Sequence, residues 1–149
     1  MTQQTIEGMA IEVIPEDDIP LPVGWELVDK ECVEEPDGPA VLKDIEFLES
    51  DVNPSDGEKM FERAMKLGNR VGLRRATALM RLQEPIPASW RGKKVLVFTG
   101  AVACDPRGFQ HVLCGYWKDW DDQLPCWSLY WSRTSNMFRS FYHIVRFLE

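Results

Sequence analysis

Between residues 56 and 83, apolar positions recur with the period of an α-helix and form one face. Residues at 55 and 56 are suited to cap such a helix, and prolines at 85 and 87 stop it. Gly68 and Gly72 lie inside the segment, and each costs about 1 kcal/mol relative to alanine in a helix. The pattern therefore predicts either one helix over about 56–83 or a helical pair that breaks near Gly68 and Asn69.

From Lys93 onward the pattern changes to short apolar runs with β-branched and aromatic residues. The runs cover 93–104, 109–117 and 126–132, with a turn at 105–108 and a polar connection at 118–125. In the third run Trp127 and Trp131 alternate with polar neighbours, so both are expected in the core, as is Trp117 at the end of the second run. This pattern predicts an antiparallel β-meander over about 93–132.

The C-terminal segment is rich in strand formers, yet its apolar positions gather on one side at helical spacing. These positions are Met137, Phe138, Phe141, Tyr142, Val145 and Leu148. Ser135 or Asn136 is suited to cap a helix here. We predict a C-terminal helix packed on the sheet, with a fourth strand as the alternative.

The N-terminal part differs in composition. Residues 1–24 hold three prolines and an acidic run, which predicts an acidic extended arm with at most a short strand at 10–14. The turn at 36–39 separates 25–33 from 41–48, which form a possible hairpin, although 41–48 also fits a short helix. The resulting fold class is α+β, with the arm followed by a single domain at 25–149.

Composition bounds the class of protein. The chain has 149 residues, 44% of them hydrophobic, which suits one globular domain. The sequence contains no run of about 18 apolar residues, the length that a membrane span needs. Its start lacks the features of a signal peptide. We therefore expect a cytoplasmic protein, bacterial or phage, whose four cysteines are free thiols: Cys32, Cys104, Cys114 and Cys126.

Charge is distributed unevenly along the chain. Residues 1–58 carry 17 acidic and two basic side chains, a formal charge of −15, whereas 59–149 carry 15 basic and seven acidic side chains, a charge of +8. On one continuous helix, six basic residues would fall within a sector of about 80°. They are Lys59, Arg63, Lys66, Arg70, Arg74 and Arg81. This basic stripe has three interpretations. It binds a nucleic-acid backbone, it forms a weak latch against the acidic N-terminal region, or it is a solvated face without a partner.

Acidic residues provide a second candidate surface. Trp120 lies in a polar connection among Asp119, Asp121 and Asp122, where tryptophan either covers the sheet or anchors an interface. The arm adds Glu16, Asp17 and Asp18. Clustered carboxylates can imitate a phosphate backbone and engage a basic groove on another protein.

Motifs for catalysis and cofactor binding are absent from the sequence. It contains no glycine-rich phosphate loop, no G-x-S-x-G, no H-E-x-x-H and no C-x-x-C pair. His111 and Cys114 are three residues apart on a predicted strand, so their side chains should point to opposite faces, which argues against a zinc site. A thiol paired with His111 remains a further possibility for Cys104, Cys114 or Cys126.

Three functional hypotheses follow. The first is a small acidic, non-enzymatic interaction protein, an inhibitor or adaptor that docks on nucleic-acid-handling machinery, with no catalytic residue, cofactor or metal. The alternative is a nucleic-acid-binding domain that uses the basic stripe, extended by Arg91, Lys93 and Lys94, with sheet aromatics such as Tyr130 stacking on bases. The second alternative is a small thiol-dependent enzyme.

Overall fold

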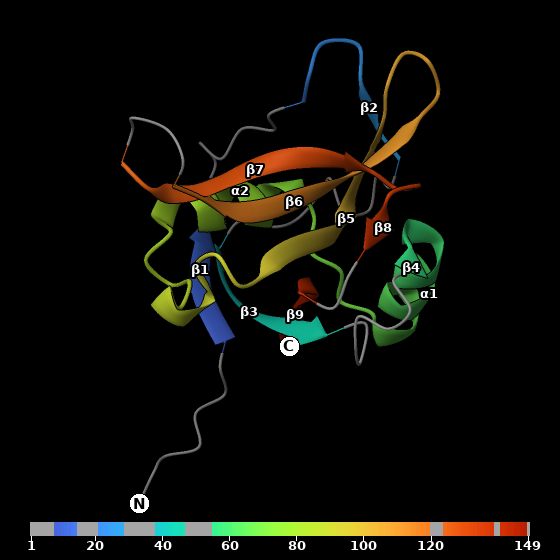
Figure 1. The fold of residues 1–149 in the computed structure, drawn as a ribbon. Helices are drawn as coiled ribbons and strands as arrows, with labels where there is room; N and C mark the ends of the chain where they lie inside the picture. Colours follow the sequence, from blue (N-terminus) through green and yellow to red (C-terminus); the bar gives the residue numbers. More distant parts are fainter. Residues whose placement is uncertain are drawn as a thin grey trace, which may run out of the picture.

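The structure, a computed structural model, describes residues 8–14, 21–28, 38–46, 55–119, 124–138 and 141–148. A curled seven-stranded sheet runs through the molecule (Figure 1). Its strands are β1 (Gly8–Val13), β2 (Glu26–Leu27), β3 (Gly38–Glu46), β5 (Val95–Cys104), β6 (Gln110–Lys118), β7 (Cys126–Arg133) and β9 (Tyr142–Leu148). The order is β1-β3-β9-β5-β6-β7, with β2 paired to β5. The predicted α+β class is confirmed.

Strand β5 is the centre of this sheet. It pairs antiparallel with β6, which in turn pairs antiparallel with β7, and it pairs parallel with β9. Eight of its ten residues are buried. A strand that has neighbours on both edges and packing on both faces reads as a continuous apolar run, which is the character of residues 95–104.

Two helices cover opposite faces of the sheet. Helix α2 (Leu73–Leu82) packs Leu79 against the face that carries Phe98 and Trp127. Helix α1 (Gly57–Leu67) lies on the other face with a small second sheet, β4 (Ser55–Asp56) paired with β8 (Met137–Phe138). There Met60 packs with Val97, whose side chain points away from that of its neighbour Phe98. The core therefore has two layers, one on each side of β5.

The segment predicted as one helix or a pair is a pair. Gly68 and Asn69 both have positive φ, 71° and 52°, and this left-handed backbone ends α1. Glycine and asparagine are the residues that adopt this conformation at least cost. Val71 then connects the helices to the sheet, because its carbonyl accepts a hydrogen bond of 2.9 Å from the Gly100 N–H.

The predicted C-terminal helix is wrong. Residues 142–148 form β9, which lies between β3 and β5. Val145 and Phe147 point to the α2 face, and Tyr142 and Ile144 point to the α1 face. Because this strand is buried on both sides, its apolar residues do not alternate with polar ones. The resulting spacing resembles a helical face, and pairing with two neighbours overrides the local pattern.

The possible hairpin between 25–33 and 41–48 does not form within the described residues. Residues 38–46 are a strand, as one reading predicted, but β3 pairs with β1 and β9, and β2 pairs with β5. The short strand allowed within the acidic arm is β1, at 8–13. Its Met9, Ile11 and Val13 side chains are buried in the α2 layer. Within the part of the chain described, no helix is long and apolar enough to cross a membrane.

Candidate functional site

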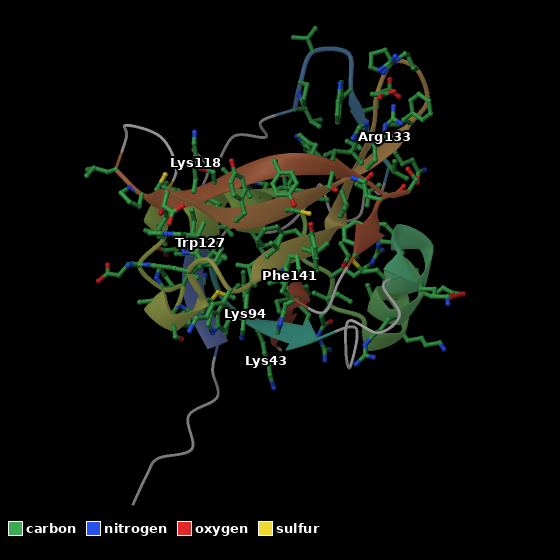
Figure 2. The ribbon with its side chains drawn as sticks, viewed as in Figure 1. Lys43, Lys94, Lys118, Trp127, Arg133 and Phe141 are labelled. Carbon is green, nitrogen blue, oxygen red and sulfur yellow. The ribbon has the colours of Figure 1, made fainter. Side chains whose placement is uncertain are left out.

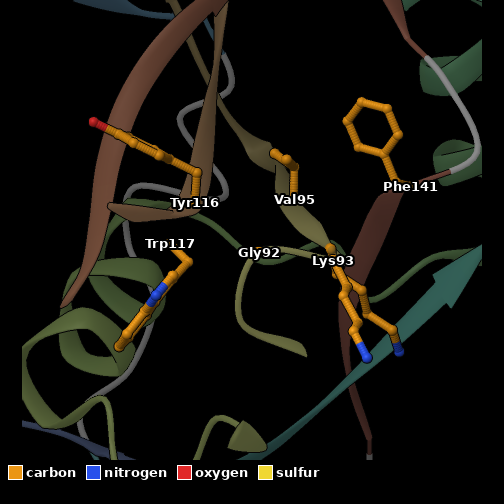
Figure 3. Close-up of a pocket in the computed structure, with 7 residues that line it drawn as sticks. Gly92, Lys93, Val95, Tyr116, Trp117 and Phe141 are labelled. Atoms are coloured by element: carbon orange, nitrogen blue, oxygen red, sulfur yellow. The ribbon is translucent and has the colours of Figure 1, made fainter. Parts of the chain in front are cut away.

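An opening of about 360 Å³ lies where β5 begins between its two neighbours. The pairing of β5 with β6 ends at Leu96 and Gly115, yet β6 continues to Lys118 because β7 still pairs with it. On the other side β9 starts opposite Val95. The space is closed by the turn that precedes β5, and we call it the aromatic–basic pocket (Figure 3). Its lining residues are Gly92, Lys93, Lys94, Val95, Tyr116, Trp117 and Phe141.

Backbone hydrogen bonds fix both walls of the aromatic–basic pocket. The carbonyl of Trp90 accepts from the N–H groups of Lys93 and Lys94, at 2.9 and 3.1 Å. The turn needs Gly92, whose φ is 73°. Across the opening, the N–H of Val95 donates to the carbonyl of Phe141 at 2.9 Å. The turn that carries the two lysines and the segment that carries Phe141 are thereby held side by side.

Aromatic rings form the sides of the pocket. Phe141 stacks on Tyr142 with ring centroids 4.8 Å apart and 29° between the ring planes, and its side chain is still 41% exposed. Tyr116 makes an edge-to-face contact with Tyr130, with centroids 5.1 Å apart. Figure 3 shows Tyr116 and Phe141 on either side of Val95. The Phe141 ring therefore packs on Tyr142, and its exposed part is accessible to a planar ligand.

Cations accompany these rings. The guanidinium of Arg91 lies 4.5 Å above the ring of Trp117, and the ammonium of Lys94 lies 4.0 Å above Trp90. Lys93 is exposed. Among the described residues that line the pocket, two are lysines and none is acidic. A concave surface with this composition attracts anions and favours flat, electron-rich groups.

Behind the pocket, the α1 face of the sheet holds a neutral cluster. Burial raises the pKa of the Cys114 thiol to about 12, although a hydrogen bond with Tyr130 acts in the opposite direction. Burial also raises the pKa of the Tyr130 hydroxyl strongly, and the neighbouring Cys114 and Tyr142 add to this effect. Both groups are uncharged at neutral pH. Tyr130, the sheet aromatic proposed to stack on bases, is partly buried and packs against this layer.

His111 lies at the other end of β6, by the β5–β6 hairpin. Its register partner Arg133 is labelled in Figure 2 and lies away from Lys94 and Phe141. The Nε2 atom of His111 lies 3.1 Å from Oδ2 of Asp105, and the His111 ring lies 4.4 Å from that of Trp25. Burial raises the pKa of the Asp105 carboxyl. Hydrogen bonds from His111 and from the turn's N–H groups outweigh that effect, and the net shift is downward. This arrangement stabilises a turn.

No described cysteine pairs with His111. The residues opposite it in register are Ala103 and Arg133. Cys114 faces the other side of β6, and Cys126 pairs in register with Lys118 at the far end of the strand. Cys32 lies outside the described residues. The described part of the chain also brings together no group of three residues able to ligate a metal ion.

The predicted basic stripe is not continuous. The angular spacing assumed one helix, and the left-handed residues at 68 and 69 separate its members. Lys59, Arg63 and Lys66 lie on α1, Arg70 lies between the helices, and Arg74 and Arg81 lie on α2. The two α2 arginines donate to backbone carbonyls, Arg81 to Glu12 in β1 at 3.0 Å and Arg74 to Ile14 just after β1 at 2.8 Å. Both therefore have structural partners.

Most residues of the predicted acidic surface are not among those that the structure describes. Asp119 is exposed at the end of β6, next to Lys118. The remaining predicted residues lie outside the described residues: Trp120, Asp121, Asp122, Glu16, Asp17 and Asp18.

Sequence reasoning found part of the aromatic–basic pocket and missed the rest. The sequence predicts Lys93 and Lys94 as an extension of the basic stripe, whereas its helical spacing predicts Phe141 on a helix face. Only the pairing of β9 with β5 places Phe141 beside the lysines. A comparison with family models, curated proteins and solved structures finds no match to this chain.

Proposed function

We propose that this chain is a non-enzymatic binding protein that holds an anionic partner at the aromatic–basic pocket. The observation that carries the proposal is the lining itself: two lysines, three aromatic rings and no acidic residue among those described. Lysine supplies a flexible point charge for anions, and the rings supply flat apolar contact area. The volume of the aromatic–basic pocket, about 360 Å³, is at the lower end of the usual range for ligand sites.

Binding rather than catalysis is supported by the roles of the reactive side chains. A nucleophilic thiol needs a lowered pKa, and that of Cys114 is raised to about 12. The imidazole of His111 is held against Asp105 and Trp25 at the far end of β6. None of these described groups borders the aromatic–basic pocket. The pocket residues are suited to recognition.

A titration with inorganic polyphosphate at low salt tests this proposal, with tryptophan fluorescence as the signal because Trp117 lines the pocket. Lys93→Glu reverses one exposed charge at the pocket, and Lys66→Glu makes the same change on α1 as the matched control. We expect Lys93→Glu to weaken binding and to lower its dependence on salt, since one phosphate contact is lost. Equal affinities for the two variants would refute the assignment of the site.

The docking hypothesis stands as a second proposal, supported by the exposed Asp119 beside Lys118. In it, the acidic residues and Trp120 engage a basic groove on a protein that handles nucleic acids. Pull-down from a host lysate, repeated with the acidic residues of 12–18 and 34–37 neutralised, tests this idea. Loss of the same partner in the neutralised variant is expected, and unchanged partners would contradict it.

A further inference from the structure

We infer that the anionic partner of the aromatic–basic pocket is a single-stranded nucleic acid, one of whose unpaired bases stacks on Phe141 while its backbone lies against Lys93. This inference rests on the proposed function, because it needs the pocket to bind an anion. It adds a second requirement, that the ligand carries a planar aromatic group beside its charge.

Phe141 has the geometry of a stacking platform. One side of its ring packs nearly parallel on Tyr142, with centroids 4.8 Å apart and 29° between planes, and 41% of the residue remains exposed. Tyr142 is held in turn by an edge-to-face contact with Phe138, at 5.1 Å. The exposed part of this ring lies one residue before β9 and offers a flat apolar surface. Every nucleobase has a flat face that such a ring can accept.

The charges lie close to this ring. Lys93 is exposed, and the hydrogen bond from Val95 to the Phe141 carbonyl holds the lysine turn beside Phe141. Arg91 is on the same turn, and its guanidinium lies over Trp117. A nucleotide presents a base and a phosphate together, so it engages both kinds of group. Inorganic polyanions engage only the cations.

The shape of the site favours single strands over duplexes. In a duplex the flat faces of the bases are covered by their neighbours, and only base edges are presented in the grooves. Duplex readers insert a helix or a β-ribbon into a groove. The aromatic–basic pocket is concave and is built from a turn and two strand ends, so it receives a group that enters from outside. An unpaired base is such a group.

Fluorescence anisotropy on the full chain tests the inference, with a labelled oligothymidylate of about 12 nucleotides, within the range of single-strand site sizes. An abasic strand of equal length, a hairpin duplex and polyphosphate complete the set of probes. Phe141→Ala removes the platform, and Phe141→Leu keeps apolar contact without a ring. The matched control is Phe109→Ala, which removes a phenylalanine of similar exposure, 45%, at the distant hairpin. Thermal melts of each variant check that the fold is intact.

We expect both Phe141 variants to lose about tenfold in affinity for oligothymidylate and to bind the abasic strand and polyphosphate as the parent does. Phe109→Ala should leave every affinity unchanged, and the duplex should bind more weakly than the single strand. If Lys93→Glu weakens all anions while the Phe141 variants change nothing, the pocket binds anions and the nucleic-acid inference is overturned. Equal binding of duplex and single strand overturns it too. If no probe binds the parent chain, the proposed function fails as well.

Discussion

The amide side chain of Gln83 closes one edge of the sheet, and its removal gives a sharp test of the fold. Strand β7 is the last strand of the described sheet, and Trp127 turns its N–H and C=O away from β6. Both groups bond to Gln83: the Trp127 N–H donates to Oε1 at 2.9 Å, and Nε2 donates to the Trp127 carbonyl at 3.0 Å. At Trp127, one side chain thus makes the two backbone hydrogen bonds that a neighbouring strand would make.

Gln83→Ala removes both hydrogen bonds from a partly buried position. Each contributes about 1 kcal/mol net, so we expect the free energy of unfolding to fall by about 2 kcal/mol. For a chain of this size that corresponds to a drop of about 4–8 °C in Tm. Urea denaturation monitored by tryptophan fluorescence measures the change. Gln110→Ala, at an exposed strand position, serves as the control and should change stability by less than about 0.5 kcal/mol.

Backbone conformation provides a second variant at this position. Gln83 has a φ of 56°, which glycine adopts more readily than alanine does. Gln83→Gly should therefore be less damaging than Gln83→Ala, although both lose the two hydrogen bonds. The reasoning is refuted if Gln83→Ala is as stable as Gln110→Ala, because the closed edge would then contribute nothing.

Three further predictions concern other parts of the molecule. Because the pKa of Asp105 is lowered below 3.8, its carboxylate contributes stability above that pH; the advantage over Asp105→Asn in urea melts should be full near pH 6 and shrink as the pH falls through the lowered pKa. Cys114, buried and with a pKa of about 12, should resist iodoacetamide at about pH 8.5 in the folded chain and react after unfolding, as mass spectrometry will show. Deleting residues 1–24 removes three buried side chains of β1, worth about 2 kcal/mol each, so circular dichroism should show loss of cooperative folding; a stable truncated chain with raised DNA affinity would instead favour the latch.

Helix α2 closes the opposite edge of the sheet as well. On this edge the Glu12 carbonyl of β1 accepts from Arg81, and the Ile14 carbonyl just after β1 accepts from Arg74. Edge strands with open backbone groups invite pairing with other chains, and charged side chains on the edge oppose it. Two residues predicted to meet nucleic acid thus have a role in the fold.

Features that depend on neighbours along the chain can be predicted from the residues alone. The helical spacing at 56–83 and the Gly68-Asn69 break lead to α1 and α2, because glycine and asparagine tolerate positive φ locally. The apolar run 93–104 and the alternation around Trp127 lead to strands because successive side chains of a strand point to opposite faces. The absence of catalytic motifs could also be read directly from the residues.

Features that depend on pairing across the chain became visible only in the fold. The apolar positions of residues 142–148 have helical spacing, yet the segment is a strand because it pairs with both β3 and β5. That insertion carries Phe141 to the lysine turn at 91–94 and so creates the aromatic–basic pocket. The residues of the predicted basic stripe likewise divide between two helices and the segment that joins them. Local spacing cannot encode which distant segment satisfies a strand's backbone groups, and here that choice shaped both the fold and its candidate site.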